Sequence, residues 1–138
     1  MRLLKIIFFL VLVSSNVLAG ANYFNEGLAL YEKKELDKAK FKFEQDIVFN
    51  PKNEKSYLYL SKIFNKQEKK KLEEKNLNTV ILLNPKNEEA TYNLAKLKLK
   101  ESDFKKSKEL IDRLLIFCKS YCQKSQKLKI EIENSLKK

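Results

Sequence analysis

A four-residue motif that recurs after 34 residues constrains this chain more than any other feature. Asn50-Pro51-Lys52-Asn53 returns as Asn84-Pro85-Lys86-Asn87, and each copy follows a run of apolar residues. Proline cannot continue a helix, and it disfavours helical geometry in the residue before it. The motif therefore predicts that a helix ends at the same place in two successive units. A fixed period of this length is typical of repeat architectures, in which each unit buries its apolar face against the next.

The composition favours helices for these units. The 138 residues include only two glycines and two prolines, and 43% of them are hydrophobic. So few turn-forming residues argue against a β fold with many short strands. The apolar content is sufficient for a buried core.

In this register the chain resembles the tetratricopeptide-repeat (TPR) family, whose unit is a pair of antiparallel helices in 34 residues. The first unit places an aromatic, a small or an apolar residue, or the closing proline, at the positions that are diagnostic of the family: Tyr23, Gly27, Leu36, Ala39, Phe43 and Pro51. The resemblance implies an all-α protein, an α-solenoid of three TPR repeats at residues 20–53, 54–87 and 88–121. Residues 122–138 then form an amphipathic capping helix over the last repeat.

The later units depart from the family pattern at a few positions. In the second unit Lys70 and Glu73 stand where the family has apolar or small residues. Because a buried glutamate without a partner is costly, we expect a local shift that turns Leu72 inward instead. In the first unit Asp46 replaces a small apolar residue, and in the third Lys119 replaces the proline.

The first nineteen residues read as a signal peptide and not as part of the fold. A short basic opening precedes eight apolar residues, Ile6–Val13, and a polar stretch then leads to Ala19. This order is typical of a secretory signal, with cleavage expected after Ala19. The run is too short for a membrane span, which needs about 20 apolar residues. We therefore expect an exported protein, periplasmic or secreted, without a transmembrane span after cleavage.

The resemblance also implies where a partner would bind. In this family the first helix of each unit lines a concave groove, and the corresponding residues can be read from the register. The candidate groove residues are Phe24, Leu28, Tyr31, Lys55, Leu58, Lys62, Asn65, Lys66, Tyr92, Lys96, Leu99 and Lys100. Aromatic and apolar residues precede the lysines, which favours a peptide or helix with hydrophobic anchors beside carboxylates. The alternative interpretation is that the lysines are a solvated helix face and the aromatics pack against neighbouring repeats.

One known mode of binding can be compared directly. TPR domains that hold the acidic tails of cytosolic chaperones use a carboxylate clamp of lysine, asparagine and arginine at five fixed positions. This chain has Phe24, Leu28, Tyr59, Glu89 and Asn93 at those positions. The clamp is therefore absent.

The charge is strongly basic, and nearly all of it comes from lysine. The chain carries 29 Lys and Arg against 18 Asp and Glu, a net charge of +11. Lysine lacks the planar fork with which arginine reads bases and phosphates, so the composition and the expected compartment argue against a nucleic-acid partner. An acidic protein, or an anionic polymer or lipid surface of the cell envelope, fits the charge better.

The two cysteines, Cys118 and Cys122, fall between the last repeat helix and the cap. On a continuous helix residues four apart lie about 6 Å from each other, near the upper limit for a disulfide, and a turn can bring them closer. In an oxidising compartment we expect a structural disulfide. The alternative is a redox dithiol, although the spacing differs from C-x-x-C.

Catalysis is not expected. Without histidine the chain lacks the commonest metal ligand and the base of Ser-His-Asp and Cys-His sites. No glycine-rich phosphate loop or metal-ligand cluster is present, so we expect no metal and no cofactor. The prediction is a non-enzymatic protein-interaction module, a scaffold, adaptor or chaperone-like protein. The alternative is a structural envelope component that binds an anionic polymer or lipid through its lysine-rich C-terminal two-thirds.

Overall fold

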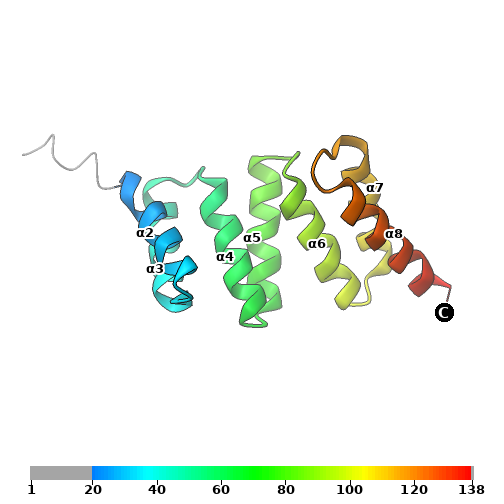
Figure 1. The fold of residues 1–138 in the computed structure, drawn as a ribbon, viewed down its shortest axis with the longest axis horizontal. Helices are drawn as coiled ribbons and strands as arrows, with labels where there is room; N and C mark the ends of the chain where they lie inside the picture. The colour runs from blue at the N-terminus through cyan, green and yellow to red at the C-terminus, as the bar shows by residue number, and fades with distance from the viewer. Residues whose placement is uncertain (1–19, 138) are drawn as a thin grey trace, which may run out of the picture. The chain divides into compact units, whose positions relative to one another are not determined.

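The computed structural model describes residues 20–137, and every regular element within this range is an α-helix (Figure 1). The predicted signal peptide, residues 1–19, lies outside the described residues. The helices are α2 (Gly20–Glu32), α3 (Leu36–Phe49), α4 (Glu54–Lys66), α5 (Lys70–Leu83), α6 (Glu88–Lys100), α7 (Phe104–Phe117) and α8 (Cys122–Leu136).

The helices repeat with the period of the sequence motif. The first helix of each pair, α2, α4 or α6, begins 34 residues after the one before it, and α8 begins after a further 34. The turns inside the pairs recur too, since Lys34, Glu68 and Ser102 have φ angles of 63°, 57° and 62°. These angles lie in the left-handed region, which ends a helix abruptly. The turns between pairs begin at Asn50 and Asn84, each followed by proline, as expected.

The chain forms two compact units, divided between Ser56 and Tyr57. In the N-terminal unit (residues 20–56) α2 packs against α3. Gly27 allows the close approach, because a Cβ atom at this position would lie 2.8 Å from Cε1 of the buried Phe43. The Phe43 ring also contacts the Phe24 ring, with 5.8 Å between their centroids.

Asp46 departs from the family pattern for a structural reason. Its carboxylate is buried and accepts hydrogen bonds from the side-chain amides of Asn50 (3.0 Å) and Asn53 (2.6 Å) and from the Ser56 hydroxyl. A buried carboxylate is tolerated when donors satisfy its oxygens. Asp46 therefore organises the turn that contains Pro51.

In the C-terminal unit (residues 57–137) one apolar core joins five helices. α6 packs against α5, α7 and α8, and α8 packs against α7. The core consists of Leu58, Leu77, Val80, Ala90, Leu94, Ala95, Leu97, Leu110, Ile111, Leu114, Leu128 and Ile132. Core positions predicted from the register, such as Leu77, Leu94 and Ile111, are confirmed as buried.

The expected shift near Leu72 was wrong. Leu72 is 41% exposed, and Glu73 is 5% exposed and occupies the position that the register assigns to it. The burial is possible because the Asn65 side-chain amide donates a 2.9 Å hydrogen bond to Glu73 Oε1. A neighbouring amide therefore supplies the partner that the sequence interpretation did not assign.

Candidate functional site

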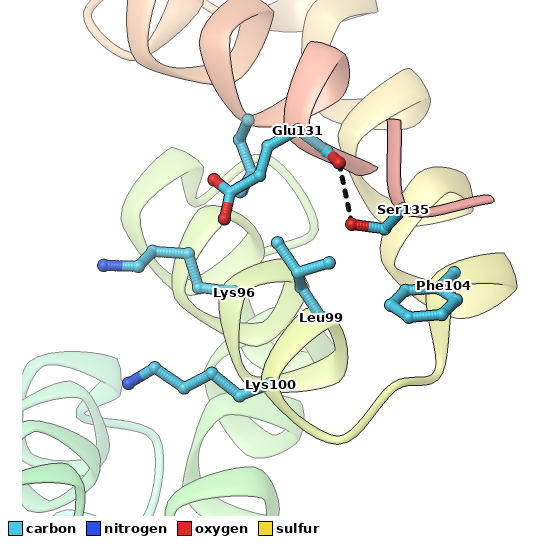
Figure 2. A pocket seen from close by; sticks show the side chains of 7 residues that line it. Lys96, Leu99, Lys100, Phe104, Glu131 and Ser135 are labelled. Atoms are coloured by element: carbon cyan, nitrogen blue, oxygen red, sulfur yellow. Dashed lines mark hydrogen bonds between the residues drawn. The ribbon is translucent and has the colours of Figure 1, made fainter. Parts of the chain in front are cut away.

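The candidate site is a hollow on the C-terminal unit between α6 and α8. It has a volume of about 320 Å³ and is lined by residues from three helices (Figure 2). α6 contributes Lys96, Leu99 and Lys100, α7 contributes Phe104, and α8 contributes Leu128, Glu131 and Ser135. Three of the predicted groove residues, all on α6, therefore lie together here.

The helical period explains why these side chains meet. Tyr92, Lys96, Leu99 and Lys100 follow one another at helical spacings of four, three and one residues, so they share a face of α6. Leu128, Glu131 and Ser135 do the same on α8. The Ser135 hydroxyl donates to the main-chain oxygen of Glu131 at 2.9 Å, as drawn in Figure 2, and so leaves the Glu131 carboxylate to face the hollow.

The lining is apolar at depth and charged at the rim. Leu128 is buried in the core, and Leu99 and Phe104 are half-buried. Lys96 and Lys100 extend to the same side of Leu99 in Figure 2, and Lys100 is exposed. A hollow of this kind fits an apolar side chain whose neighbours carry negative charge.

Lys96 and Lys100 differ from the neighbouring lysines in their partners. Lys62 pairs with Glu89 at 2.8 Å, and Lys98 pairs with Glu74 at 2.6 Å. Within residues 20–137 no ion pair joins Lys96 or Lys100 to a carboxylate, although the Lys96 ammonium lies 5.9 Å from the centroid of the Tyr92 ring. The charges of these two lysines are therefore available to a ligand.

Glu73 lies close enough to feel both lysines. Burial raises the pKa of the Glu73 carboxyl, and the hydrogen bond from Asn65 and the charges of Lys100 and Lys96 only partly oppose this rise. The carboxyl is thus a buried acid beside two cations, and it contributes to the local field without filling the hollow.

Tyr92 connects the site to the turn before α8. Its ring packs against the Tyr121 ring, with 5.4 Å between centroids and an angle of 56° between the planes. Burial, and to a lesser degree the charge of Glu131, raises the pKa of Tyr92. This predicted groove residue is therefore half-buried and holds α8 against α6.

The predicted groove residues of α4 lie in three different environments. Leu58 is only 8% exposed and belongs to the core, so it offers little surface. Lys62 is compensated by Glu89, and Asn65 is engaged with Glu73. Lys66 is exposed at the end of the helix.

The remaining predicted groove residues belong to the N-terminal unit. Phe24, Leu28 and Tyr31 are half-buried on α2, and Phe24 packs on Phe43. Lys55 is exposed, and its main-chain N–H donates to the Asn53 side-chain oxygen at 3.2 Å. None of these four residues lines the hollow described above.

Sequence reasoning did not assign Phe104, Leu128, Glu131 and Ser135 to a binding site. The missing step was to treat α8 as the first helix of a further unit, which its start 34 residues after Glu88 indicates. In that register α8 presents a lining face of its own in addition to covering the core.

A disulfide and a carboxylate hold the turn that precedes α8. Cys118 and Cys122 are bonded, with 5.3 Å between their Cα atoms. The Glu88 carboxylate accepts hydrogen bonds from the main-chain N–H groups of Lys119 (2.8 Å), Ser120 (2.9 Å) and Tyr121 (2.8 Å). Desolvation alone would raise the pKa of Glu88, but the three N–H donors together outweigh it, so the pKa is lowered.

Two further searches cover only residues 20–137. No group of three or more Cys, Asp or Glu side chains in this range could hold a metal ion. In the same range none of the helices combines the length and the apolar character that crossing a membrane requires.

Comparison with known proteins shows the fold and nothing finer. No family model matches the chain, and no curated protein does. Among solved structures, the first TPR of Spaghetti (RPAP3), bound to the HSP90 peptide SRMEEVD, is 13% identical with a TM-score of 0.77, over 86% of this chain and 94% of that one. The TPR2B domain of yeast Sti1, in a pHsp70 complex, is 14% identical with a TM-score of 0.76, over 83% and 96%.

A third solved structure agrees with these two. The Arabidopsis OM64 TPR domain is 16% identical with a TM-score of 0.75, over 84% of this chain and 95% of that one. Similarity at this TM-score and coverage establishes that the chain has the fold of a TPR domain.

Proposed function

We propose that this protein is a non-enzymatic protein-interaction module that binds a peptide or helical segment of a partner at the hollow between α6 and α8. One observation carries the proposal: an apolar lining of Leu99, Phe104 and Leu128 lies beside the uncompensated charges of Lys96 and Lys100. Two TPR structures with the same fold were solved with peptide or chaperone partners. These partners support the class of function.

The expected ligand differs from the HSP90 peptide held by the neighbour. The residues at the five clamp positions of that binding mode are Phe24, Leu28, Tyr59, Glu89 and Asn93. Glu89 is moreover engaged with Lys62, and a ligand carboxylate placed there would meet a like charge. We propose instead that an aliphatic or aromatic side chain enters the hollow and that an adjacent carboxylate pairs with Lys96 or Lys100.

The proposal is tested by crosslinking followed by a binding measurement. A photoreactive amino acid at Lys96 or Lys100 captures the partner in cells, while the same probe at the exposed Asn78 on α5 serves as a control. A synthetic peptide with the captured sequence should bind the unmodified chain. Its affinity should fall by about tenfold in the Lys96→Glu/Lys100→Glu variant, because attraction becomes repulsion.

A matched variant separates the site from the general charge. Lys105→Glu/Lys106→Glu removes the same number of lysines from the first turn of α7. If these two double variants weaken binding equally, or if the Asn78 probe captures the same segment, the hollow is not the site. Equal binding by the unmodified chain and the Lys96→Glu/Lys100→Glu variant would also exclude the hollow.

We further propose that the module acts outside the cytoplasm, as a scaffold, adaptor or chaperone-like protein of the cell envelope. The order of basic, apolar and small residues in residues 1–19 supports export. A disulfide between Cys118 and Cys122 is compatible with an oxidising compartment.

A further inference from the structure

The most exposed large aliphatic side chains of residues 20–137 occupy one repeated position. Val48, Leu82 and Ile116 are the penultimate residues of α3, α5 and α7, at intervals of 34 residues, and they are 74%, 81% and 85% exposed. A single exposed aliphatic residue needs no explanation, but the same residue class at the same position in each second helix is a pattern.

In the C-terminal unit two of these residues project from one end of the helices. α5 ends at Leu83, and the following turn is closed by the bond from the Asn87 N–H to the Asn84 oxygen just before α6 begins. α7 ends at Phe117, and its following residues bond to Glu88, the first residue of α6. The ends of α5 and α7 therefore flank the same helix start, and Figure 1 shows both connections at the same end.

The turns at this end are basic. Lys86, Lys119 and Lys124 are all exposed there, on the two turns and the first turn of α8. The nearest carboxylates are engaged, since Glu88 accepts three main-chain N–H groups and Glu89 pairs with Lys62. The end face thus combines protruding aliphatic side chains with cationic groups.

We propose that this end face, defined by Leu82, Leu83, Lys86, Ile116 and Lys119, docks on an anionic phospholipid surface. Side chains that protrude can enter a soft apolar medium without a matching cavity, whereas a protein partner would need complementary pockets. Lysines beside them are attracted by anionic headgroups, and two such signals together are what stable peripheral binding requires.

The N-terminal unit repeats the same chemistry within itself. Val48 and the adjacent Phe49 are exposed at the end of α3, and Lys52 is exposed in the turn that follows. The end face is independent of the hollow between α6 and α8, because they share no residue.

The absence of tryptophan from the chain permits a direct test with the full-length protein. Leu82→Trp and Ile116→Trp each place one reporter on the end face, and Ile130→Trp places a control reporter at an exposed aliphatic position of α8. Vesicles of phosphatidylglycerol and of phosphatidylcholine, with and without brominated acyl chains, then report whether each reporter enters the apolar layer.

We expect the emission of the two end-face reporters to shift to the blue and to be quenched by brominated phosphatidylglycerol, and the Ile130→Trp emission to be unchanged. Quenching should fall several-fold in phosphatidylcholine and at high salt, since the lysine attraction is screened. Vesicle partitioning should drop about tenfold for each of Leu82→Ser and Ile116→Ser. Ile130→Ser should leave partitioning unaltered.

Several outcomes would overturn the proposal. If the chain does not bind phosphatidylglycerol vesicles, or binds them with the end-face reporters unquenched, the end face does not dock on lipid. The second result also covers attachment through residues 1–19 alone. Lys96→Glu/Lys100→Glu should bind vesicles normally, so failure of the peptide-binding proposal and failure of this one are distinguishable.

Discussion

Glu73 is an acid that the fold keeps in a position suited to a small or apolar side chain. It is nearly inaccessible, and a hydrogen bond from Asn65 satisfies one oxygen. Burial disfavours the charged form, which is why the pKa of Glu73 is raised. The folded protein therefore holds the Glu73 proton more tightly than the unfolded chain does.

The Glu73→Gln variant should consequently be more stable than the unmodified protein at neutral pH. The amide oxygen still accepts from Asn65, and no charge has to be desolvated. Because the pKa is raised, the destabilisation by Glu73 is full above its folded pKa and absent below the ordinary value of 4.5. The gain in Tm should therefore shrink as the pH falls through the folded pKa and vanish below about pH 4.5.

Thermal unfolding of both proteins across this pH range checks the prediction. Glu109→Gln, at an exposed carboxylate on α7, serves as the control and should have little effect on the Tm at any pH. A Glu73→Gln protein that is less stable at pH 7 would mean that the attraction of Lys96 and Lys100 outweighs desolvation.

Gly27 is required by the close contact of α2 and α3 and not by backbone geometry. The Gly27→Ala variant should lose about 1–3 kcal/mol of unfolding free energy, because its Cβ would meet the fully buried Phe43 ring. This loss exceeds the gain of about 1 kcal/mol that alanine brings to a helix interior. Urea unfolding measures the difference.

A double-mutant cycle assigns the loss to the contact itself. Phe43→Leu frees space, so Gly27→Ala should cost less in that background. Asn25→Ala, at an exposed position of the same helix, is the matched control. Equal losses at Gly27 in both backgrounds would refute the steric explanation.

At the scale of elements, the connection from α7 to α8 replaces a proline turn by other means. Lys119 stands where the two earlier turns have Pro51 and Pro85, and the turn is instead held by the disulfide and by Glu88. Three N–H donors to one carboxylate form a small anion-binding turn closed by the protein's own side chain. This turn fixes the start of α8 and, with it, one wall of the hollow.

Glu88→Gln should loosen that turn at neutral pH, since a neutral amide is a weaker acceptor than a carboxylate. The pKa of Glu88 is lowered in the folded protein, so its stabilising contribution is present above the ordinary value of 4.5 and is lost as the pH falls through the folded pKa. The Tm of the variant should thus lie below that of the unmodified protein at pH 7 and meet it in acid.

Hydrogen exchange of the Lys119, Ser120 and Tyr121 amides gives the local measurement. Protection at these amides should fall in Glu88→Gln at pH 7, while amides in the middle of α5 should retain theirs. Unchanged protection at all three would show that the disulfide alone holds the turn.

At the scale of the whole molecule, the period carried most of the prediction. The two Asn-Pro motifs and the spacing of Gly27, Ala39 and Phe43 were enough to predict the all-helical TPR fold, because helix ends and close contacts depend on local residue types. The hollow was predicted only on its α6 side. Its α8 side depends on how a helix outside the recognised repeats packs, and local patterns contain no such information.

The errors have the same origin. Glu73 was expected to avoid burial because its own sequence neighbourhood offers no partner, yet Asn65 from the preceding helix provides one. Asp46 could be noted as a departure, but its role required the positions of Asn50, Asn53 and Ser56 around it. Pairings between helices are thus the step at which prediction from the sequence ended.

The last prediction concerns where the whole molecule acts. If residues 1–19 are a secretory signal, the protein isolated from cells should begin at Gly20, and Leu10→Arg should abolish processing. A charge in the apolar run costs about 2.5–3.5 kcal/mol of insertion free energy, whereas Leu10→Ile preserves the run and is the matched control. Intact mass and cell fractionation report both results. Recovery of the chain with Met1 still attached, or equal processing of the two variants, would refute export through this segment, while the peptide-binding proposal would stand on its own test.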